Sequence, residues 1–196
     1  KAGNSRSVSL PKRLTPKLAY FIGYFLGDGG LKDIQKSYLA SKTFEYKLIV
    51  GDEFLLQVKV LQKLFKDLFR VMPPIRLERI KKGEKLYYLN PTSKMIYRFL
   101  TRVFEMPSGP KADKLKVPKI IQNADSEIKR WFVRGIFDAD GDTRAVEGGF
   151  KSQPRIKLRM KCSEFIFEMK KLLEETFNVS VNGPYLDKGY KSSCIQ

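Results

Sequence analysis

The pattern of apolar and polar positions changes its period several times along this chain. Over residues 53–69 the apolar positions recur every three or four residues, the spacing of one helix face. Over 44–50 and 155–160 apolar and charged residues alternate, which predicts strands with one face on a core. The same criteria predict helices at 15–27, 93–104 and 163–177, another beginning after Ser126, and strands at 75–80, 86–89 and 143–146. A last hairpin is predicted over 179–190, turning at Asn182-Gly183-Pro184.

Two of the predicted helices share an unusual composition. Residues 18–30 and 131–142 are mostly apolar, and each apolar run ends in an acidic residue followed by glycine. Each also has small residues four positions apart, which lie on one helix face and leave a strip where another backbone can come close. The strips consist of Gly23 and Gly27 in the first helix and Gly135 and Ala139 in the second. The two helices are therefore predicted to pack along these strips, with Asp28 and Asp140 brought together at their C-terminal ends.

The predicted elements occur in the same order twice. Residues 15–105 predict helix, strand pair, helix, strand pair and helix, and residues 125–196 repeat this order without the last helix, so the second half is expected to be incomplete. A basic arm, 1–14, precedes the first half, and a linker rich in proline and lysine, 106–124, joins the two. The predicted fold is α+β, with two pseudo-symmetric αββαββα halves packed through the glycine-bearing helices and with antiparallel sheets.

Charge points to the class of partner. The 196 residues include 38 Lys and Arg against 21 Asp and Glu, a formal net charge of +17. Such a charge favours nucleic acid over an acidic protein or an anionic membrane, while 12% aromatic residues argue for a packed core. No apolar run approaches the roughly 20 residues of a membrane span, and no signal peptide is recognisable. The protein is therefore expected to be intracellular, in the cytoplasm or nucleoid.

Residue types that are missing exclude several kinds of active site. The chain has no histidine, which rules out a histidine general base, a histidine-ligated metal and a Ser-His-Asp triad. Its two cysteines, Cys162 and Cys194, form no CxxC pair, so a cysteine zinc site is not available. A calcium loop of the EF-hand type beginning at Asp138 also fails, because Thr143 and Gly149 stand where glycine and glutamate are required.

The remaining candidate chemistry is carried by Asp28 and Asp140. Two carboxylates held close together repel each other, and a divalent cation is the usual reason for such a pair. Mg²⁺ binds carboxylate and water oxygens and shares its other positions with phosphate. Two buried helices with ordinary glycine caps would explain either segment alone. The occurrence of both in one chain favours the metal site.

The two segments resemble the signature of the LAGLIDADG homing endonucleases. Residues 133–141, VRGIFDADG, follow the motif closely and depart from it mainly at Arg134, whereas residues 21–29, FIGYFLGDG, are a looser copy with Leu26 in place of the first acid. The resemblance implies a monomer that acts as a pseudo-dimer on double-stranded DNA, with Mg²⁺ as cofactor and Mn²⁺ able to replace it. It also implies that Asp28 and Asp140 are catalytic and that, with Gly27 and Ala139, they form the metal site, while Asp138 is structural.

Family members often carry a polar residue near the end of the strand that follows each motif. Lys161 stands at this place in the second half and is expected to be catalytic, whereas Val50 and Gly51 offer no such side chain in the first. Basic residues on the predicted strands are expected to contact DNA, as a sheet in the major groove reads base edges through alternate side chains. These candidates are Lys47, Arg76, Lys85, Arg155, Lys157 and Arg159. A solvated strand face is the competing explanation for any one of them.

The predicted function is site-specific, divalent-metal-dependent cleavage of double-stranded DNA. Two alternatives remain open. The same fold could serve a DNA-binding regulator or an RNA maturase that does not use the metals, or the chain could be the endonuclease insert of an intein.

Overall fold

A computed structural model describes residues 7–38, 41–79, 85–144, 155–187 and 192–196. The first half contains α1 (Pro16–Asp28), β1 (Gly30–Tyr38), β2 (Ser41–Asp52), α2 (Leu55–Phe69), β3 (Ile75–Arg79), β4 (Lys85–Leu89) and α3 (Lys94–Val103). After the short α4 (Lys119–Gln122), the second half contains α5 (Ser126–Asp140), β5 (Gly141–Arg144), β6 (Arg155–Met160), α6 (Ser163–Phe177), β7 (Tyr185–Asp187) and β8 (Ser192–Ile195). The α+β fold with two related halves is confirmed.

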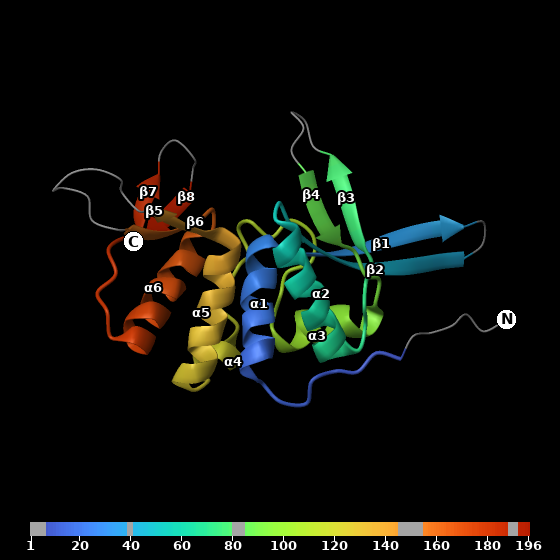
Figure 1. The fold of residues 1–196 in the computed structure, drawn as a ribbon, viewed down its shortest axis with the longest axis horizontal. Helices are drawn as coiled ribbons and strands as arrows, with labels where there is room; N and C mark the ends of the chain where they lie inside the picture. Colours follow the sequence, from blue (N-terminus) through green and yellow to red (C-terminus); the bar gives the residue numbers. More distant parts are fainter. Residues whose placement is uncertain (1–6, 39–40, 80–84, 145–154, 188–191) are drawn as a thin grey trace.

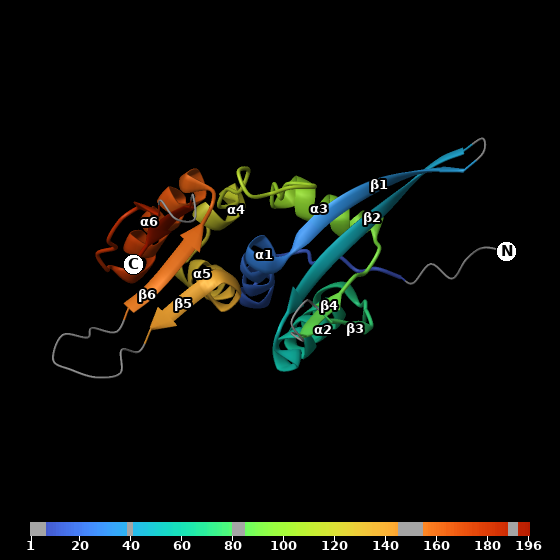
Figure 2. The same cartoon turned by 90° about the horizontal axis from the view of Figure 1, so that it is seen from above.

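Each half contributes a four-stranded antiparallel sheet. The strand orders are β1-β2-β4-β3 and β5-β6-β8-β7. They are equivalent, because each strand of the second sheet has the same place as its counterpart in the first. Helices α1 and α5 lie side by side between the two sheets, with α6 on the far side of α5 and with α2 and α3 on the far side of α1 (Figures 1 and 2). Each of these helices runs directly into the first strand of its own sheet. The C-terminal ends of both helices therefore lie between the sheets.

Helices α1 and α5 both begin at a side-chain cap. The Thr15 hydroxyl accepts a hydrogen bond from the Leu18 N–H, and Pro16 follows at the first helical position. The Asp125 carboxylate accepts from the Ile128 N–H in the same way. Apolar residues cover most of α1, because it is enclosed by α5 on one side and by α2 and β2 on the other.

Glycines make the contact between α1 and α5 possible. A Cβ atom added to Gly23 would lie 2.2 Å from the Phe132 carbonyl oxygen, and one added to Gly135 would lie 2.2 Å from the Tyr20 carbonyl oxygen. Each helix thus places a glycine against the backbone of the other. No side chain larger than hydrogen fits either position without moving a helix.

Most of the predicted elements are present, with two differences. The first strand pair begins earlier than the alternation indicated, because β1 at Gly30–Tyr38 pairs along its whole length with β2. The predicted hairpin over 179–190 is wrong in the residues that form its strands. Residues 179–184 are not a strand, and the chain turns at Gly183, whose φ of +102° favours glycine. The hairpin is formed instead by β7 and β8, with Tyr185 opposite Cys194.

Helix α3 makes the two halves unequal. Helices α2 and α6 have the same length and both end at a phenylalanine, Phe69 and Phe177, followed by a left-handed residue. Phe69 is fully buried and lies against Phe99 of α3, at 6.2 Å between ring centroids. Phe177 is 39% exposed and lines an apolar groove of about 580 Å³ together with Ile156 and Leu173. Among the described residues of the second half, no helix covers this groove.

The segments outside the two halves also pack on the core where they are described. Residues Val8, Leu10 and Leu14 of the predicted basic arm contact it, and the Ser9 N–H donates to the Phe69 carbonyl. Leu115 and Val117 of the predicted linker are buried. None of the described helices combines the length and the apolar composition that crossing a bilayer requires.

Candidate active site

Asp28 and Asp140 occupy equivalent positions, as the last residues of α1 and α5. The glycine after each one caps the helix, as the Gly29 N–H donates to the Phe25 carbonyl and the Gly141 N–H to the Phe137 carbonyl. A Cβ at Gly29 or at Gly141 would lie 2.4 Å from that same carbonyl oxygen. The Asp-Gly pairs therefore end each helix abruptly and leave the aspartate at its tip.

The Asp140 carboxylate reaches across the helix contact toward α1. A Cβ added to Gly27 would lie 2.8 Å from Oδ2 of Asp140 and 2.5 Å from Cβ of Ala139. Glycine at position 27 is thus what allows the Asp140 side chain to lie against α1. The predicted helix-packing residues Gly23, Gly27, Gly135 and Ala139 all lie in this contact.

Both carboxyl groups titrate above their ordinary range. Burial, followed by repulsion from Asp140, raises the pKa of Asp28 to about 7, with Asp52 adding to the rise and Lys111 opposing it. Burial raises the pKa of Asp140 as well, again opposed by Lys111. Asp28 keeps an exposed side, so water screens part of its repulsion. The negative charge of the pair, which Lys111 offsets in part, favours a bound cation.

Lys111 is a site residue that the sequence did not indicate. Its ammonium donates to the backbone carbonyls of Leu26, at 2.7 Å, of Gly29, at 2.6 Å, and of Gly27. These three bonds use all three ammonium donors and satisfy carbonyls at the C-terminal end of α1, where the helix dipole favours a cation. Burial lowers the pKa of Lys111 to about 8, although Asp140 and Asp28 act in the opposite direction.

A cavity of about 780 Å³ opens beside Asp28 on the side of the first sheet. Five acidic residues line it: Asp28, Asp52, Glu53, Glu78 and Asp138. The Tyr24 hydroxyl donates to Asp52 at 2.5 Å, and the Phe54 N–H donates to the other oxygen of the same carboxylate at 2.8 Å. Burial and this hydrogen bond raise the pKa of Tyr24. The cavity wall is therefore negative in a protein whose overall charge is strongly positive.

The first acid of the second motif joins the two helices. Asp138 accepts a hydrogen bond from the Tyr20 hydroxyl at 2.9 Å, and Gln57 of α2 donates to the same hydroxyl at 3.0 Å. Arg134, the main departure from the family motif, lies 3.6 Å from Asp138 and stacks over Trp131. These contacts give Asp138 partners at the helix contact, separate from Asp28 and Asp140.

The donor set fits Mg²⁺ better than a metal enclosed by protein. Among the described residues, no group of three or more Asp, Glu, Cys or His side chains is arranged to hold an ion. Mg²⁺ in proteins is commonly bound by one or two carboxylates, with water and substrate phosphates completing the octahedron. Asp28 and Asp140 supply such a pair, with pKa values that are raised chiefly by burial. The Gly27 carbonyl, predicted as a further ligand beside Ala139, accepts from Lys111 in this structure.

The predicted DNA-contacting residues of the first half do not all share one sheet face. Side chains alternate between faces along a strand. Lys47 shares its face with Ile49, which lines the acidic cavity, and pairs with Glu45 at 3.6 Å. Arg76 is exposed on the same face as Glu78, also a cavity residue. Lys85 is an even number of residues from the buried Leu89 and therefore lies on the same sheet face as Leu89, opposite to that of Lys47 and Arg76. It is exposed because it stands at the start of β4.

In the second half the three basic residues of β6 alternate with the core. Lys157 and Arg159 have the opposite parity to Leu158 and Met160, which are buried. Arg155 pairs with Arg144 in the register, and its side chain lies outside the described residues. Lys157 is opposite Asp142 in β5. By parity, Lys157 and Arg159 belong to the face turned away from the core.

Lys161 lies just after β6 and its side chain is exposed. Its catalytic role stays a prediction, because the cation that acts on Asp28 and Asp140 in this structure is Lys111. Lys161 stands two residues before α6, and the residue two before α2 is Glu53 rather than Val50 or Gly51. The structural counterpart in the first half is therefore acidic, whereas Val50 and Gly51 lie within β2.

Comparison with known proteins agrees with this fold. Residues 127–183 match the family model described as a LAGLIDADG-like domain. The crystal structure of I-DmoI in complex with DNA and Mn superposes with a TM-score of 0.63 at 18% identity, covering 93% of this chain and 89% of that one. The N-terminal LAGLIDADG domain of WhiA gives a TM-score of 0.53 at 13% identity, over 92% and 73% of the two chains.

Two curated proteins from Methanocaldococcus jannaschii are also similar. A probable translation initiation factor is 27% identical over 183 residues, and a glutamine–fructose-6-phosphate aminotransferase is 31% identical over 168 residues. The matches cover 86% and 85% of this chain, but 14% and 13% of those proteins. The resemblance drawn from the two motifs is thus confirmed, with a LAGLIDADG-like second half and the fold of the homing endonucleases over nearly the whole chain.

Proposed function

We propose that this chain, with its LAGLIDADG-like second half and homing-endonuclease fold, is a site-specific, divalent-metal-dependent endonuclease of double-stranded DNA. The observation that carries the proposal is the placement of Asp28 and Asp140 at adjacent helix ends, between two sheets, with Lys111 beside them. Each half supplies one aspartate and one sheet, so a single chain presents two equivalent half-sites. A monomer can therefore address both strands of a duplex.

The reaction is hydrolysis of a phosphodiester, in which water adds to phosphorus and a P–O bond breaks. Asp28 and Asp140 would hold Mg²⁺, or Mn²⁺ in its place, which supplies Lewis-acid stabilisation of the phosphate oxygens and lowers the pKa of bound water. The acidic cavity would help to recruit the cation. Lys111 would stabilise the charge that builds up on the phosphate, as its ammonium is fixed beside both carboxylates.

DNA would lie across the two sheets, with the duplex passing over the ends of α1 and α5. Lys47, Arg76, Lys157 and Arg159 then contact it from strand faces turned away from the core. Their charge is part of the +17 that attracts the phosphate backbone. In this arrangement the acidic cavity beside Asp28 lies close to the cleaved phosphate, and the basic strand faces lie along the duplex.

A second candidate setting for the same activity is supported by the curated relatives. The initiation factor and the aminotransferase have unrelated names, and each matches this chain over a small fraction of its own length. A segment common to both is therefore separate from either named activity. The endonuclease insert of an intein has this property, and the chain could occupy such a position in a longer protein.

Cleavage can be tested with a library of DNA duplexes that contain randomised sites, incubated with Mg²⁺ and separately with Mn²⁺. The expected result is enrichment of one cut sequence by the wild-type protein. Asp140→Asn should abolish cutting and retain binding of that sequence, because the amide keeps the size of the carboxylate and removes its charge. A wild-type protein that binds one sequence tightly and cuts it in neither metal would refute the proposal. A regulator or maturase with this fold would then be favoured. The structure of the WhiA domain, which is not named as an endonuclease, shows that the fold occurs outside the named endonucleases.

A further inference from the structure

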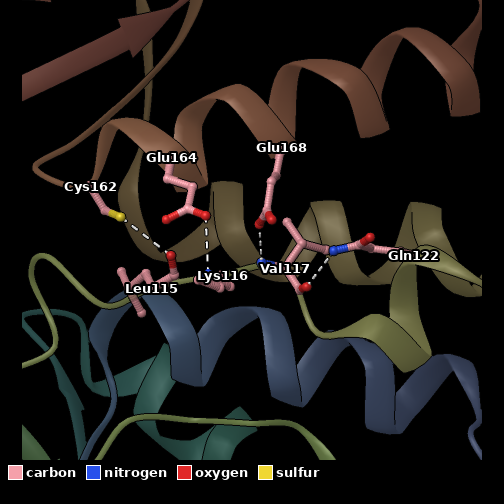
Figure 3. Close-up of polar contacts among 7 residues, drawn as sticks. All are labelled: Leu115, Lys116, Val117, Gln122, Cys162, Glu164 and Glu168. Carbon is pink, nitrogen blue, oxygen red and sulfur yellow. Dashed lines mark hydrogen bonds and ion pairs between the residues drawn. The ribbon is translucent and has the colours of Figure 1, made fainter.

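The linker between the two halves is fastened to α6 by a row of polar contacts (Figure 3). The Val117 N–H donates to Oε2 of Glu168 at 2.6 Å, and the Leu115 carbonyl accepts from the Cys162 thiol at 3.3 Å. Lys116 lies 3.1 Å from Glu164. We call linker residues 115–117, with their partners on α6, the α6–linker clasp.

Glu168 makes the strongest contact of the clasp. Its carboxylate accepts from a backbone N–H in a partly buried setting, and such charge-assisted hydrogen bonds are roughly twice as strong as neutral ones. The Lys116–Glu164 pair is exposed on both sides, at 58% and 61%, and exposed pairs contribute little. The side chains of Leu115 and Val117 are buried on either side of it. The position of the linker backbone thus depends chiefly on Glu168 and this burial.

The other end of the linker is fastened to the first half. The Ser108 hydroxyl donates to Asp33 at 2.8 Å, and the Gly109 N–H donates to the Leu31 carbonyl at 2.8 Å. Lys111 follows directly, and the Lys114 N–H donates to its carbonyl at 2.9 Å in a single turn. Lys111 therefore sits between two anchors, one on β1 and one on α6, with only a turn separating it from the clasp.

We propose that Glu168 is a positioning residue that holds Lys111 at the active site through the α6–linker clasp; this inference rests on the proposed function, in which Lys111 acts on the phosphate. The partly buried ammonium of Lys111 loses hydration, and this loss is unfavourable. The backbone that carries Lys111 therefore has to hold the ammonium among the carbonyls at the end of α1. Loss of the Glu168 contact allows residues 111–117 other conformations. The ammonium then spends less time beside Asp28 and Asp140.

The first test does not depend on cleavage. The rate at which Lys111 is reductively methylated is measured by peptide mass spectrometry for the wild type, Glu168→Ala and the control Glu175→Ala. Glu175 lies two turns further along the same helix, and its ion pair is with Lys171 rather than with a linker residue. Lys111 is expected to react several times faster in Glu168→Ala and at the wild-type rate in the control. Equal rates in all three proteins would overturn the proposal, whether or not the protein cuts DNA.

The second test uses the cleaved sequence found with the library. Glu168→Ala is expected to lower the single-turnover cleavage rate by about tenfold or more, since a misplacement of ~1 Å can cost on the order of 10²-fold. The dissociation constant for DNA, measured with Ca²⁺, should stay within about twofold of the wild-type value, because Glu168 lies outside the DNA-facing strands. Glu168→Gln should recover most of the rate, as its amide oxygen still accepts from Val117.

A double-mutant cycle separates positioning from a general loss of structure. In a Lys111→Met background, Glu168→Ala should have no further effect on the cleavage rate. An equal loss in both backgrounds would show that Glu168 acts on the whole fold and would refute the proposal. If Lys111 is protected by Glu168 in the methylation test but the wild type cuts nothing, the proposed function fails and the positioning role stands.

Discussion

Asp28→Asn is expected to stabilise the metal-free protein above neutral pH. In the native state the pKa of Asp28 is about 7, against an ordinary value of 3.8. The native state therefore keeps a proton that the unfolded chain releases, and wild-type stability falls as pH rises between about 4 and 7. This difference of about three in pKa corresponds to a loss of roughly 4 kcal/mol in the free energy of unfolding, at 1.36 kcal/mol for each pKa unit. Because Asp28 has an exposed side, screening reduces this to about 1–2 kcal/mol.

The measurement is urea denaturation of the two proteins in EDTA, at several pH values from 4 to 8. The gain of Asp28→Asn over the wild type should be near zero at pH 4 and reach its full size above pH 7. Asp113→Asn, at an exposed position of the linker, is the matched control and should give no such rise. Adding Mg²⁺ should then stabilise the wild type and leave Asp28→Asn unchanged. A variant less stable than the wild type at pH 8 in EDTA would show that the ionised carboxylate of Asp28 does not destabilise the metal-free protein.

Two further predictions concern packing. Gly23→Ala should lower the free energy of unfolding, measured by chemical denaturation, by about 1–3 kcal/mol or more, because its Cβ would meet the Phe132 carbonyl at 2.2 Å. The control Gly30→Ala, whose Cβ would have no atom within 4 Å, should change this free energy by less than about 0.5 kcal/mol. Phe69→Ala should lower the free energy of unfolding by about 3–5 kcal/mol, and the equivalent Phe177→Ala by less than half of that, because only Phe69 is covered by α3. Equal losses in the two variants would show that Phe177 is buried in solution.

The two motif helices could be predicted from sequence because their signals are local. Glycine and alanine four residues apart fix which face of each helix is smooth, and the Asp-Gly pairs fix where each helix ends. The boundaries of α6 and β6 were also predicted correctly, because a clear period of 3.6 or 2 runs over their whole length. In each of these cases the residues that determine the element lie within it.

The predicted strand boundaries were incomplete where contacts with another segment decide the structure. β1 has no clear alternation, and its strand conformation comes from pairing with β2 along nine residues. The hairpin of the second half was placed too early, because Asn182 and Gly183 have the composition of a hairpin turn. Asn182 instead exchanges backbone hydrogen bonds with Gln196, and the strand begins after the turn. Pairing with a neighbouring strand leaves no periodic signal within the paired segment itself.

Lys111 shows the same limit at the candidate active site. In the sequence it is one of several lysines in a segment punctuated by proline and glycine, which is the composition of a solvated linker. Its distinction arises only in three dimensions, where the Gly109–Leu31 bond and the α6–linker clasp bring it to the open end of α1. The three carbonyls it binds are open because Gly29 ends the helix there. The Asp-Gly motif therefore places the carboxylate and also creates the acceptors for the lysine, so an Asp-Gly helix end beside a short linker is where such a cation should be sought.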